Sequence, residues 1–329
     1  MNAFEYANPS TKEQAVQLLG SEWGEAEVLA GGTDLLSLMK VFGTTPKRLV
    51  NIKGIEEFQG IDYISDSGLR LGATLVLAEL IEHPIVQKNY RSLVQAAEGV
   101  RSSQIQSFGT VGGDLCQRPR CWYFRNGLGY FPKDNEGRDL IRNGENQYHA
   151  ILGNSGTACF VSASSLAPAL IALDAKFRIF GNQGWREIPA EKFFMTPIKP
   201  SQRETIMEPN DILGEILLPN ATTTLNATYE VREKEALDWP LVTASVALKI
   251  KEGKVEHVRL VLGHVAPTPW RCIQAETNLI GKVVDEDSAK EAGKIALNEA
   301  TPLSKNSYKI NLAQVAIKRA ILDASLGGL

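Results

Sequence analysis

The sequence predicts an α+β protein of two domains, the second smaller than the first. Strand and helix patterns alternate through residues 1–110. Two apolar runs around the turn at 251–254, followed by two amphipathic segments, predict paired antiparallel strands and closing helices. The 329 residues exceed twice the length of a common domain of about 150 residues, and the polar, turn-prone segment 219–226 predicts a boundary.

The elements follow from short apolar patterns. We predict a helix over 12–19, capped by Ser10 or Thr11, and a buried strand over 26–30. Further strands are predicted over 48–52, 69–73, 175–180, 242–250 and 255–265. Further helices are predicted over 75–81, 93–97, 166–173, 288–298 and 311–324.

A glycine pair separates the strand over 26–30 from another helix. Thr33 is placed to cap this helix, and apolar residues recur at helical spacing at Leu35, Leu38, Met39 and Phe42. Because glycine has no side chain, an anion can approach the backbone N–H groups of Gly31 and Gly32 at the positive helix end. The turn is therefore predicted to suit a pyrophosphate, although Gly-Gly-Thr between two elements is more often only a turn and a cap.

A second glycine pair occurs in Gly109-Thr110-Val111-Gly112-Gly113, again beside a hydroxyl. Two such loops could bracket one diphosphate, and two unrelated turns are the alternative. Asp34 and Asp114 follow the two loops. Since like charges repel, we expect their carboxylates to point away from a bound anion or to bind a ribose or adenine donor.

Residues 114–153 lose clear periodicity, which predicts an inserted loop with a function. Its aromatic residues could contact a ligand or partner chain, or could anchor the loop in the core. They are Trp122, Tyr123, Phe124, Tyr130 and Phe131.

Composition excludes several classes of protein. The net charge of -3 disfavours nucleic acid as a partner, and no apolar run approaches the roughly 20 residues of a membrane span. The start of the chain lacks an export signal, which predicts a cytoplasmic protein, or a periplasmic one if a partner carries the signal. Four scattered cysteines predict reduced thiols, and four separated histidines predict no metal site.

The two glycine loops resemble the FAD-binding loops of the flavin subunit in molybdenum hydroxylases, the family of xanthine dehydrogenase and carbon monoxide dehydrogenase. The resemblance continues through Cys121-Trp122-Tyr123-Phe124-Arg125, residues 149–153 and residues 238–242, and so covers nearly the whole chain. It is greatest to the flavin subunits of periplasmic-type aldehyde oxidoreductases. It implies a two-subdomain FAD-binding domain of the PCMH type over 1–220, with the inserted loop at about 114–153. A small α/β domain with an antiparallel sheet and helices would follow over 226–329.

The resemblance also implies the FAD-binding residues. They are Val28, Leu29, Ala30, Gly31, Gly32, Thr33, Asp34, Leu35, Thr110, Gly113, Asp114, Ile212, Leu213 and Lys234. The two loops would hold the pyrophosphate and adenosine parts, with Ile212 or Leu213 near the adenine. Lys234 would lie near the isoalloxazine ring, where a cation stabilises the negative charge gained on reduction. The alternative for Lys234 is a solvated surface lysine.

Three features depart from the family pattern. Relatives with the inserted loop carry four cysteines for a [4Fe-4S] cluster, whereas here only Cys121 and Cys159 resemble ligands. We therefore predict no cluster, although His149 could in principle replace one ligand. Ser164-Ser165-Leu166 stands where Pro-Ser-Asp is common, and Asp114 stands where asparagine is usual. These two changes imply a FAD site that is either retuned or decayed.

The resemblance implies a FAD-carrying electron-transfer subunit of a heterotrimeric oxidoreductase. Its partners would be a molybdenum-cofactor large subunit, where the substrate is hydroxylated, and a [2Fe-2S] small subunit that delivers electrons. FAD would pass them to an external acceptor. The alternatives are a flavin-depleted structural or assembly subunit and a self-sufficient flavin oxidase, for which no catalytic base is evident. We also expect Gly31→Val to block the pyrophosphate while sparing the C-terminal domain.

Overall fold

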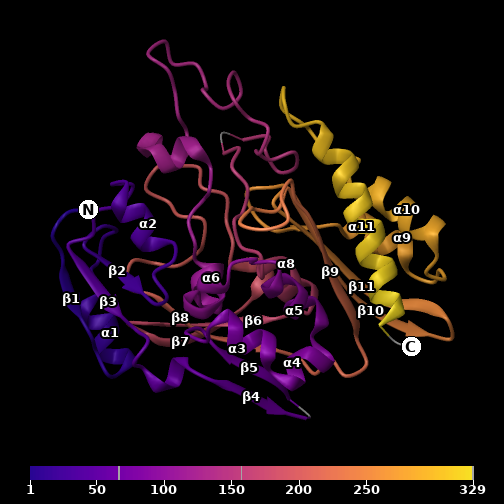
Figure 1. Ribbon diagram of the computed structural model, residues 1–329, viewed down its shortest axis with the longest axis horizontal. Helices are drawn as coiled ribbons and strands as arrows, with labels where there is room; N and C mark the ends of the chain where they lie inside the picture. Colours follow the sequence, from indigo (N-terminus) through magenta and orange to yellow (C-terminus); the bar gives the residue numbers. More distant parts are fainter. Residues whose placement is uncertain (66, 157, 328–329) are drawn as a thin grey trace.

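The computed structural model describes residues 1–65, 67–156 and 158–327, and three blocks are each built around a sheet (Figure 1). The first block is a small parallel sheet in the order β1-β3-β2 with two helices. Its elements are β1 (Glu5–Ala7), α1 (Lys12–Leu18), β2 (Ala26–Leu29), α2 (Leu35–Lys40) and β3 (Arg48–Asn51). Thr11 caps α1 by accepting a hydrogen bond from the backbone N–H of Gln14 at 3.2 Å.

The second block is an antiparallel sheet in the order β4-β5-β8-β6-β7. Its strands are β4 (Ile61–Ile64), β5 (Gly68–Gly72), β6 (Lys176–Gly181), β7 (Gly184–Pro189) and β8 (Ile212–Leu218). The helical segments are η1 (Glu56–Phe58), α3 (Leu77–Glu82), α4 (Pro84–Asn89), α5 (Arg91–Glu98), α6 (Ser103–Phe108), α7 (Val111–Leu115), α8 (Ala167–Ala172) and η3 (Ala190–Lys192). Apolar residues of α3, α5 and α8 pack on the sheet and form the largest buried cluster.

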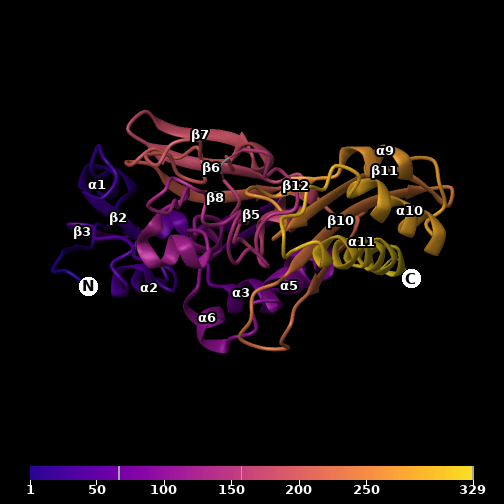
Figure 2. The ribbon, with the colours of Figure 1, turned by 90° about the horizontal axis from the view of Figure 1, so that it is seen from above.

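The third block is an antiparallel sheet in the order β12-β11-β10-β9, covered by helices. Its elements are β9 (Leu225–Val231), β10 (Val242–Lys251), β11 (Lys254–Gly263), β12 (Trp270–Arg271), α9 (Ile273–Leu279), α10 (Glu286–Ala296) and α11 (Tyr308–Leu326). Figure 2 shows this block at the end of the molecule opposite β1 and α1. The separation of 1–220 from 226–329 into two domains stays a prediction, and β9 begins between these ranges.

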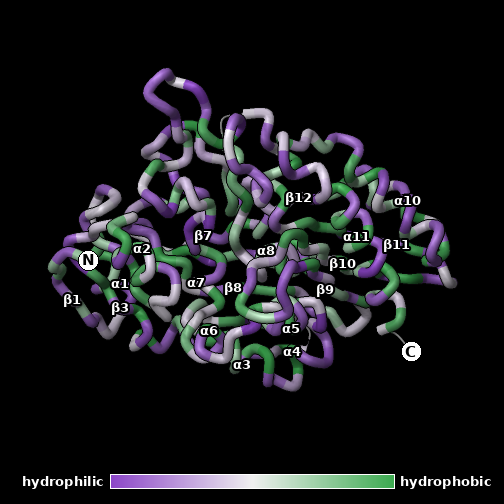
Figure 3. Tube along the Cα trace, turned by 45° about the horizontal axis from the view of Figure 1, so that its top comes forward, coloured by the Kyte–Doolittle hydropathy of each residue, from purple (hydrophilic) through white to green (hydrophobic). Residues whose placement is uncertain are grey.

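The inserted segment lies between α7 and α8 in the chain and packs against the third block. It contains one short helical segment, η2 (Phe124–Leu128), and its polar outer part projects from the molecule (Figure 3). At its far end, the backbone N–H groups of Ile151 and Leu152 donate to the carbonyl of Val265 at 2.8 and 3.0 Å. Both side chains are buried in the core of the third block. The segment therefore docks on the C-terminal part of the chain.

The α+β class is confirmed, and the elements predicted from long patterns form within a few residues of their predicted ends. Two local predictions are wrong. Thr33 does not cap α2, because Asp34 occupies the cap position and its side chain makes no capping bond. Phe42 is not part of the helix, which ends at Lys40; its φ is 57° and its side chain is exposed.

Candidate functional site

The two glycine loops meet in space although about 75 residues separate them in the sequence. A Cβ atom built on Gly31 would overlap the carbonyl oxygen of Phe108 and lie 3.2 Å from the Cα atom of Gly109. Position 31 therefore excludes a side chain because the second loop packs against it. This corrects the expectation for Gly31→Val, which would push the loops apart instead of simply blocking a ligand.

The first loop presents a row of unused hydrogen-bond donors. In the described part of the chain, none of the backbone N–H groups from Gly31 to Leu35 donates to a protein acceptor. Gly32 turns the chain with a φ of 73°, a conformation that L side chains rarely adopt. Consecutive N–H groups at a turn and a helix start form a concave site that suits an anion.

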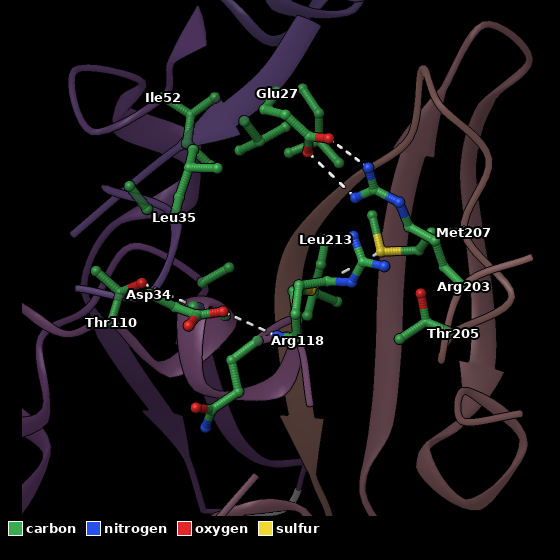
Figure 4. Close-up of a pocket in the computed structure, with 18 of the residues that line it drawn as sticks. Glu27, Asp34, Leu35, Ile52, Thr110, Arg118, Arg203, Thr205, Met207 and Leu213 are labelled. Atoms are coloured by element: carbon green, nitrogen blue, oxygen red, sulfur yellow. Dashed lines mark hydrogen bonds and ion pairs between the residues drawn. The ribbon is translucent and has the colours of Figure 1, made fainter. Parts of the chain in front are cut away.

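A cleft with about 1200 Å³ of empty space, part of it open to solvent, runs along both loops. The predicted residues that line it are Val28, Ala30, Gly31, Gly32, Thr33, Asp34, Leu35, Thr110, Gly113, Ile212 and Leu213. We call this space the inner cleft; Figure 4 shows Asp34, Leu35, Thr110 and Leu213 around it. Leu29 does not line this cleft. Its δ carbon lies beside Gly32, 3.3 Å from the position of a built Cβ.

Two further cavities continue from the inner cleft. The middle cavity shares Thr33, Asp34, Thr110 and Gly113 with it and is also lined by Asp114. The outer cavity contains Lys234 and shares residues 238–240 and Arg120 with the middle cavity. The structure thus brings the two loops, Ile212 and Leu213 together, and it places the exposed Lys234 on the outer cavity, which adjoins the middle cavity.

Asp34 is held away from the loop donors by the inserted segment. Its carboxylate accepts hydrogen bonds from the backbone N–H of Arg118 and from Nη2 of Arg125, each at 2.8 Å. Nη2 of Arg120 lies 3.3 Å from the same carboxylate. The positive groups offset the charge of Asp34, so this carboxylate is not an obstacle to an anion on the loop.

Asp114 also turns away from the inner cleft and ties the second loop to the start of α8. Its carboxylate accepts hydrogen bonds from the hydroxyl of Ser164 at 2.5 Å and from the backbone N–H of Leu166 at 3.0 Å. The Leu166 side chain is fully buried in the core. Burial raises the pKa of Asp114, and the hydrogen bonds from Ser164 and Leu166 oppose this shift. Asp114 therefore places a carboxylate beside Leu166, the position at which the resemblance implies an aspartate in relatives.

Several arginine contacts at the cleft are not evident from the sequence. Nε of Arg118 lies 3.0 Å from a carboxylate oxygen of Glu204, and Arg203 forms an ion pair with Glu27 across the inner cleft (Figure 4). Only the arginine-rich composition of 118–125 could have indicated such contacts, because their partners lie far away in the sequence. The first ion pair fastens the inserted segment to the segment before β8, and the second fastens that segment to the first block.

The region that resembles a cluster site contains a hydrogen-bonded cysteine–histidine pair. Sγ of Cys121 lies 3.2 Å from Nε2 of His149. Burial raises the pKa of Cys121 and lowers that of His149 to about 4, so both groups are neutral near pH 7. Within residues 1–65, 67–156 and 158–327, no three His, Cys, Asp or Glu side chains are grouped to hold a metal ion. In the same residues, no helix is long and apolar enough to span a membrane.

Comparison with known proteins places the chain in a family. Residues 2–221 match the FAD-binding domain of molybdopterin dehydrogenases, and residues 227–324 match the C-terminal domain of carbon monoxide dehydrogenase flavoproteins. The chain is 29% identical to the carbon monoxide dehydrogenase medium chain of Hydrogenophaga pseudoflava, covering 97% of this chain and 96% of that protein. It is 28% identical to the aldehyde oxidoreductase FAD-binding subunit PaoB of Escherichia coli, covering 98% and 99%.

Solved structures give the same result. Carbon monoxide dehydrogenase from Hydrogenophaga pseudoflava superposes with a TM-score of 0.79 at 28% identity, covering 99% of this chain and 98% of that one. The relatives named here are subunits of multisubunit oxidoreductases. The predicted family, fold and FAD cofactor are confirmed. The chain belongs to the family of FAD-binding subunits of molybdenum-containing hydroxylases, a family of oxidoreductases.

Proposed function

We propose that the two glycine loops hold the diphosphate of FAD at the junction of the inner cleft and the middle cavity. The observation that carries this proposal is the row of unused N–H donors from Gly31 to Leu35, which opens onto the cleft. A diphosphate supplies the charged acceptors that these donors lack. The donor set and the glycine-walled space therefore fit the cofactor.

The rest of the cofactor would extend in both directions from this point. We assign the adenine to the side of Ile212 and Leu213, and the isoalloxazine ring to the middle cavity and the Lys234 side. Leu29 would support the first loop from behind, and Asp114 would fix the second loop. When bound, FAD supplies the two-electron redox chemistry, whereas the protein binds the cofactor and tunes its potential.

We further propose the partners and the direction of electron flow. A [2Fe-2S] small subunit would deliver electrons that a molybdenum-cofactor large subunit takes from its substrate, and this subunit would pass them to an external acceptor. The support is the match along nearly the full length to a medium chain of carbon monoxide dehydrogenase and to an aldehyde oxidoreductase FAD-binding subunit. The location stays a prediction: cytoplasmic, or periplasmic with a signal-bearing partner.

Titration of the purified chain with FAD tests the cofactor site. Thr33 is exposed and lines both the inner cleft and the middle cavity, so Thr33→Trp would fill the junction without disturbing the core. We expect at least a tenfold weaker Kd, measured by quenching of flavin fluorescence. Ser37→Trp, one turn further along the exposed side of α2, is the matched control and should bind like the wild type. A wild-type chain that quenches no flavin fluorescence even with excess FAD would instead support the flavin-depleted structural subunit.

A further inference from the structure

Arg120 lies where three parts of the molecule meet. It belongs to the inserted segment, and its Nη2 lies 3.3 Å from the carboxylate of Asp34 on the first glycine loop. Its guanidinium carbon lies 4.3 Å from the ring centroid of Trp239, in the connection between β9 and β10. This distance is typical of a cation–π contact, which holds the guanidinium against the indole ring.

The hydrogen bonds of Arg120 are incomplete. A guanidinium has five N–H donors, and the recorded acceptors, Asp34 and the side-chain oxygen of Gln117 at 3.1 Å, both face Nη2. Nε is buried and has no acceptor among the described residues. Burial also lowers the pKa of Arg120 to about 10, which leaves the group charged at neutral pH. Nη1 also has no acceptor among the described residues, but it is accessible to solvent, so an acceptor atom of a ligand can reach it.

The position of Arg120 identifies which part of a bound cofactor it faces. Arg120 lines the middle and outer cavities but not the inner cleft. The diphosphate, proposed at Thr33 and Gly113, would lie between Arg120 and the adenine side at Leu213. Arg120 therefore faces the half of FAD that carries the isoalloxazine ring.

The carboxylates near Arg120 are already engaged by other groups. Asp34 accepts hydrogen bonds from Arg125 and from the backbone of Arg118, and Asp114 accepts them from Ser164 and Leu166. Neither carboxylate accepts a hydrogen bond from Nη1 of Arg120, which is not buried. This donor therefore remains available to a group bound in the middle cavity.

We propose that Arg120 contacts the isoalloxazine ring of FAD through Nη1 and stabilises the negative charge that the ring gains on reduction. This inference rests on the proposed function, with the adenine on the Ile212 side. The cation acts at close range because it is partly desolvated and held in place by Trp239. Lys234 is exposed to water at the rim of the outer cavity, so its effect on the ring is expected to be weaker.

The test is the two-electron midpoint potential of the FAD-loaded full chain, together with its affinity for ADP. In Arg120→Met, we expect the ratio of the Kd of reduced flavin to the Kd of oxidised flavin to rise at least tenfold over the wild type. Such a rise lowers the midpoint potential by about 30 mV or more. The affinity for ADP, which carries only the adenine side and the diphosphate, should stay within a factor of two. Lys234→Met should give a smaller shift. Arg138→Met, which removes an exposed arginine from the same inserted segment, is the control and should give none.

The outcomes separate this proposal from the proposed function. An unchanged potential in FAD-loaded Arg120→Met would overturn the role of Arg120 and leave FAD binding intact. A tenfold loss of ADP affinity without a shift in potential would overturn it as well, because the cation would then serve the diphosphate. If Arg120→Met is isolated without FAD, Arg120→Gln provides the same readout with an uncharged planar group. If both variants lose FAD while Arg138→Met retains it, Arg120 is an anchor for the cofactor and the tuning role is wrong.

Discussion

The two glycine loops look alike in the sequence but differ in what their glycines do. In the first loop, the N–H groups from Gly31 to Leu35 have no acceptor among the described residues. In the second loop, the N–H of Gly112 donates to the carbonyl of Ala73 at 2.8 Å, and the N–H of Gly113 donates to the hydroxyl of Thr110 at 3.0 Å. The donors of the first loop are free for the anion that we propose there, whereas the donors at the glycine pair of the second loop are used within the protein.

The difference shows that a glycine near a ligand site can be required for packing instead of binding. A Cβ on Gly112 would lie 2.8 Å from the Cβ of Ala73, because α7 rests directly on the chain after β5. Gly31 packs in the same way against the backbone at Phe108. The second loop therefore holds the first loop in place, and the unused N–H donors that we propose for the diphosphate belong to the first loop.

The largest expected effect comes from Gly31→Ala compared with Gly113→Ala. The new methyl group at position 31 meets backbone atoms that cannot rotate away, so we expect a loss of about 3 kcal/mol or more in unfolding free energy. At position 113 only the hydroxyl of Thr110 lies near, at 2.9 Å, and a side chain can move, so the loss should be about 1 kcal/mol or less. Urea unfolding of both variants measures the difference, and equal losses would contradict the packing of the two loops.

A moderate effect is expected from Thr110→Ala. The Thr110 hydroxyl caps α7 by accepting the N–H of Gly113, and loss of an N-cap costs about 1 kcal/mol. Thr110→Ser retains the hydroxyl and should recover most of this stability in thermal unfolding. If the alanine variant were as stable as the serine variant, the hydroxyl would not support the second loop, and the contrast between the loops would be weaker.

The smallest effect is expected in the pH dependence of stability at Asp114. Burial raises the pKa of this carboxyl above its ordinary value of 3.8. At a pH between 3.8 and the raised pKa, the folded state therefore binds a proton that the unfolded state has released. The stability of the wild type should therefore fall, relative to Asp114→Asn, as the pH rises from 3.8 through the raised pKa. Urea unfolding of both proteins from pH 4 to 7 measures this, and parallel curves would show that Asp114 does not titrate in this way.

Local patterns were enough to predict the longest elements but missed several strands. The helix at α11 and the hairpin of β10 and β11 have many residues in phase, so periodicity identifies them. β1, with three residues, and the edge strand β4 are too short for a pattern, and β8 is recognised only by its place between β5 and β6. Likewise, Thr33 was predicted as a cap from its position alone, whereas distant arginines determine how Asp34 and this helix start are arranged.

The sequence by itself determined the chemistry that is available: two glycine pairs, the adjoining hydroxyl and carboxyl groups, and a family pattern that names the cofactor. Only the tertiary structure decided which donors are unused, which glycines are required for packing, and which cation lines the cavity that we propose for the flavin. The physical reason is that a free N–H, whether of the backbone or of a guanidinium, is defined by what surrounds it, and at this site the surroundings come from segments that are distant in the chain. Arg120 and Trp239, more than 100 residues apart, meet only because the inserted segment docks on the C-terminal block.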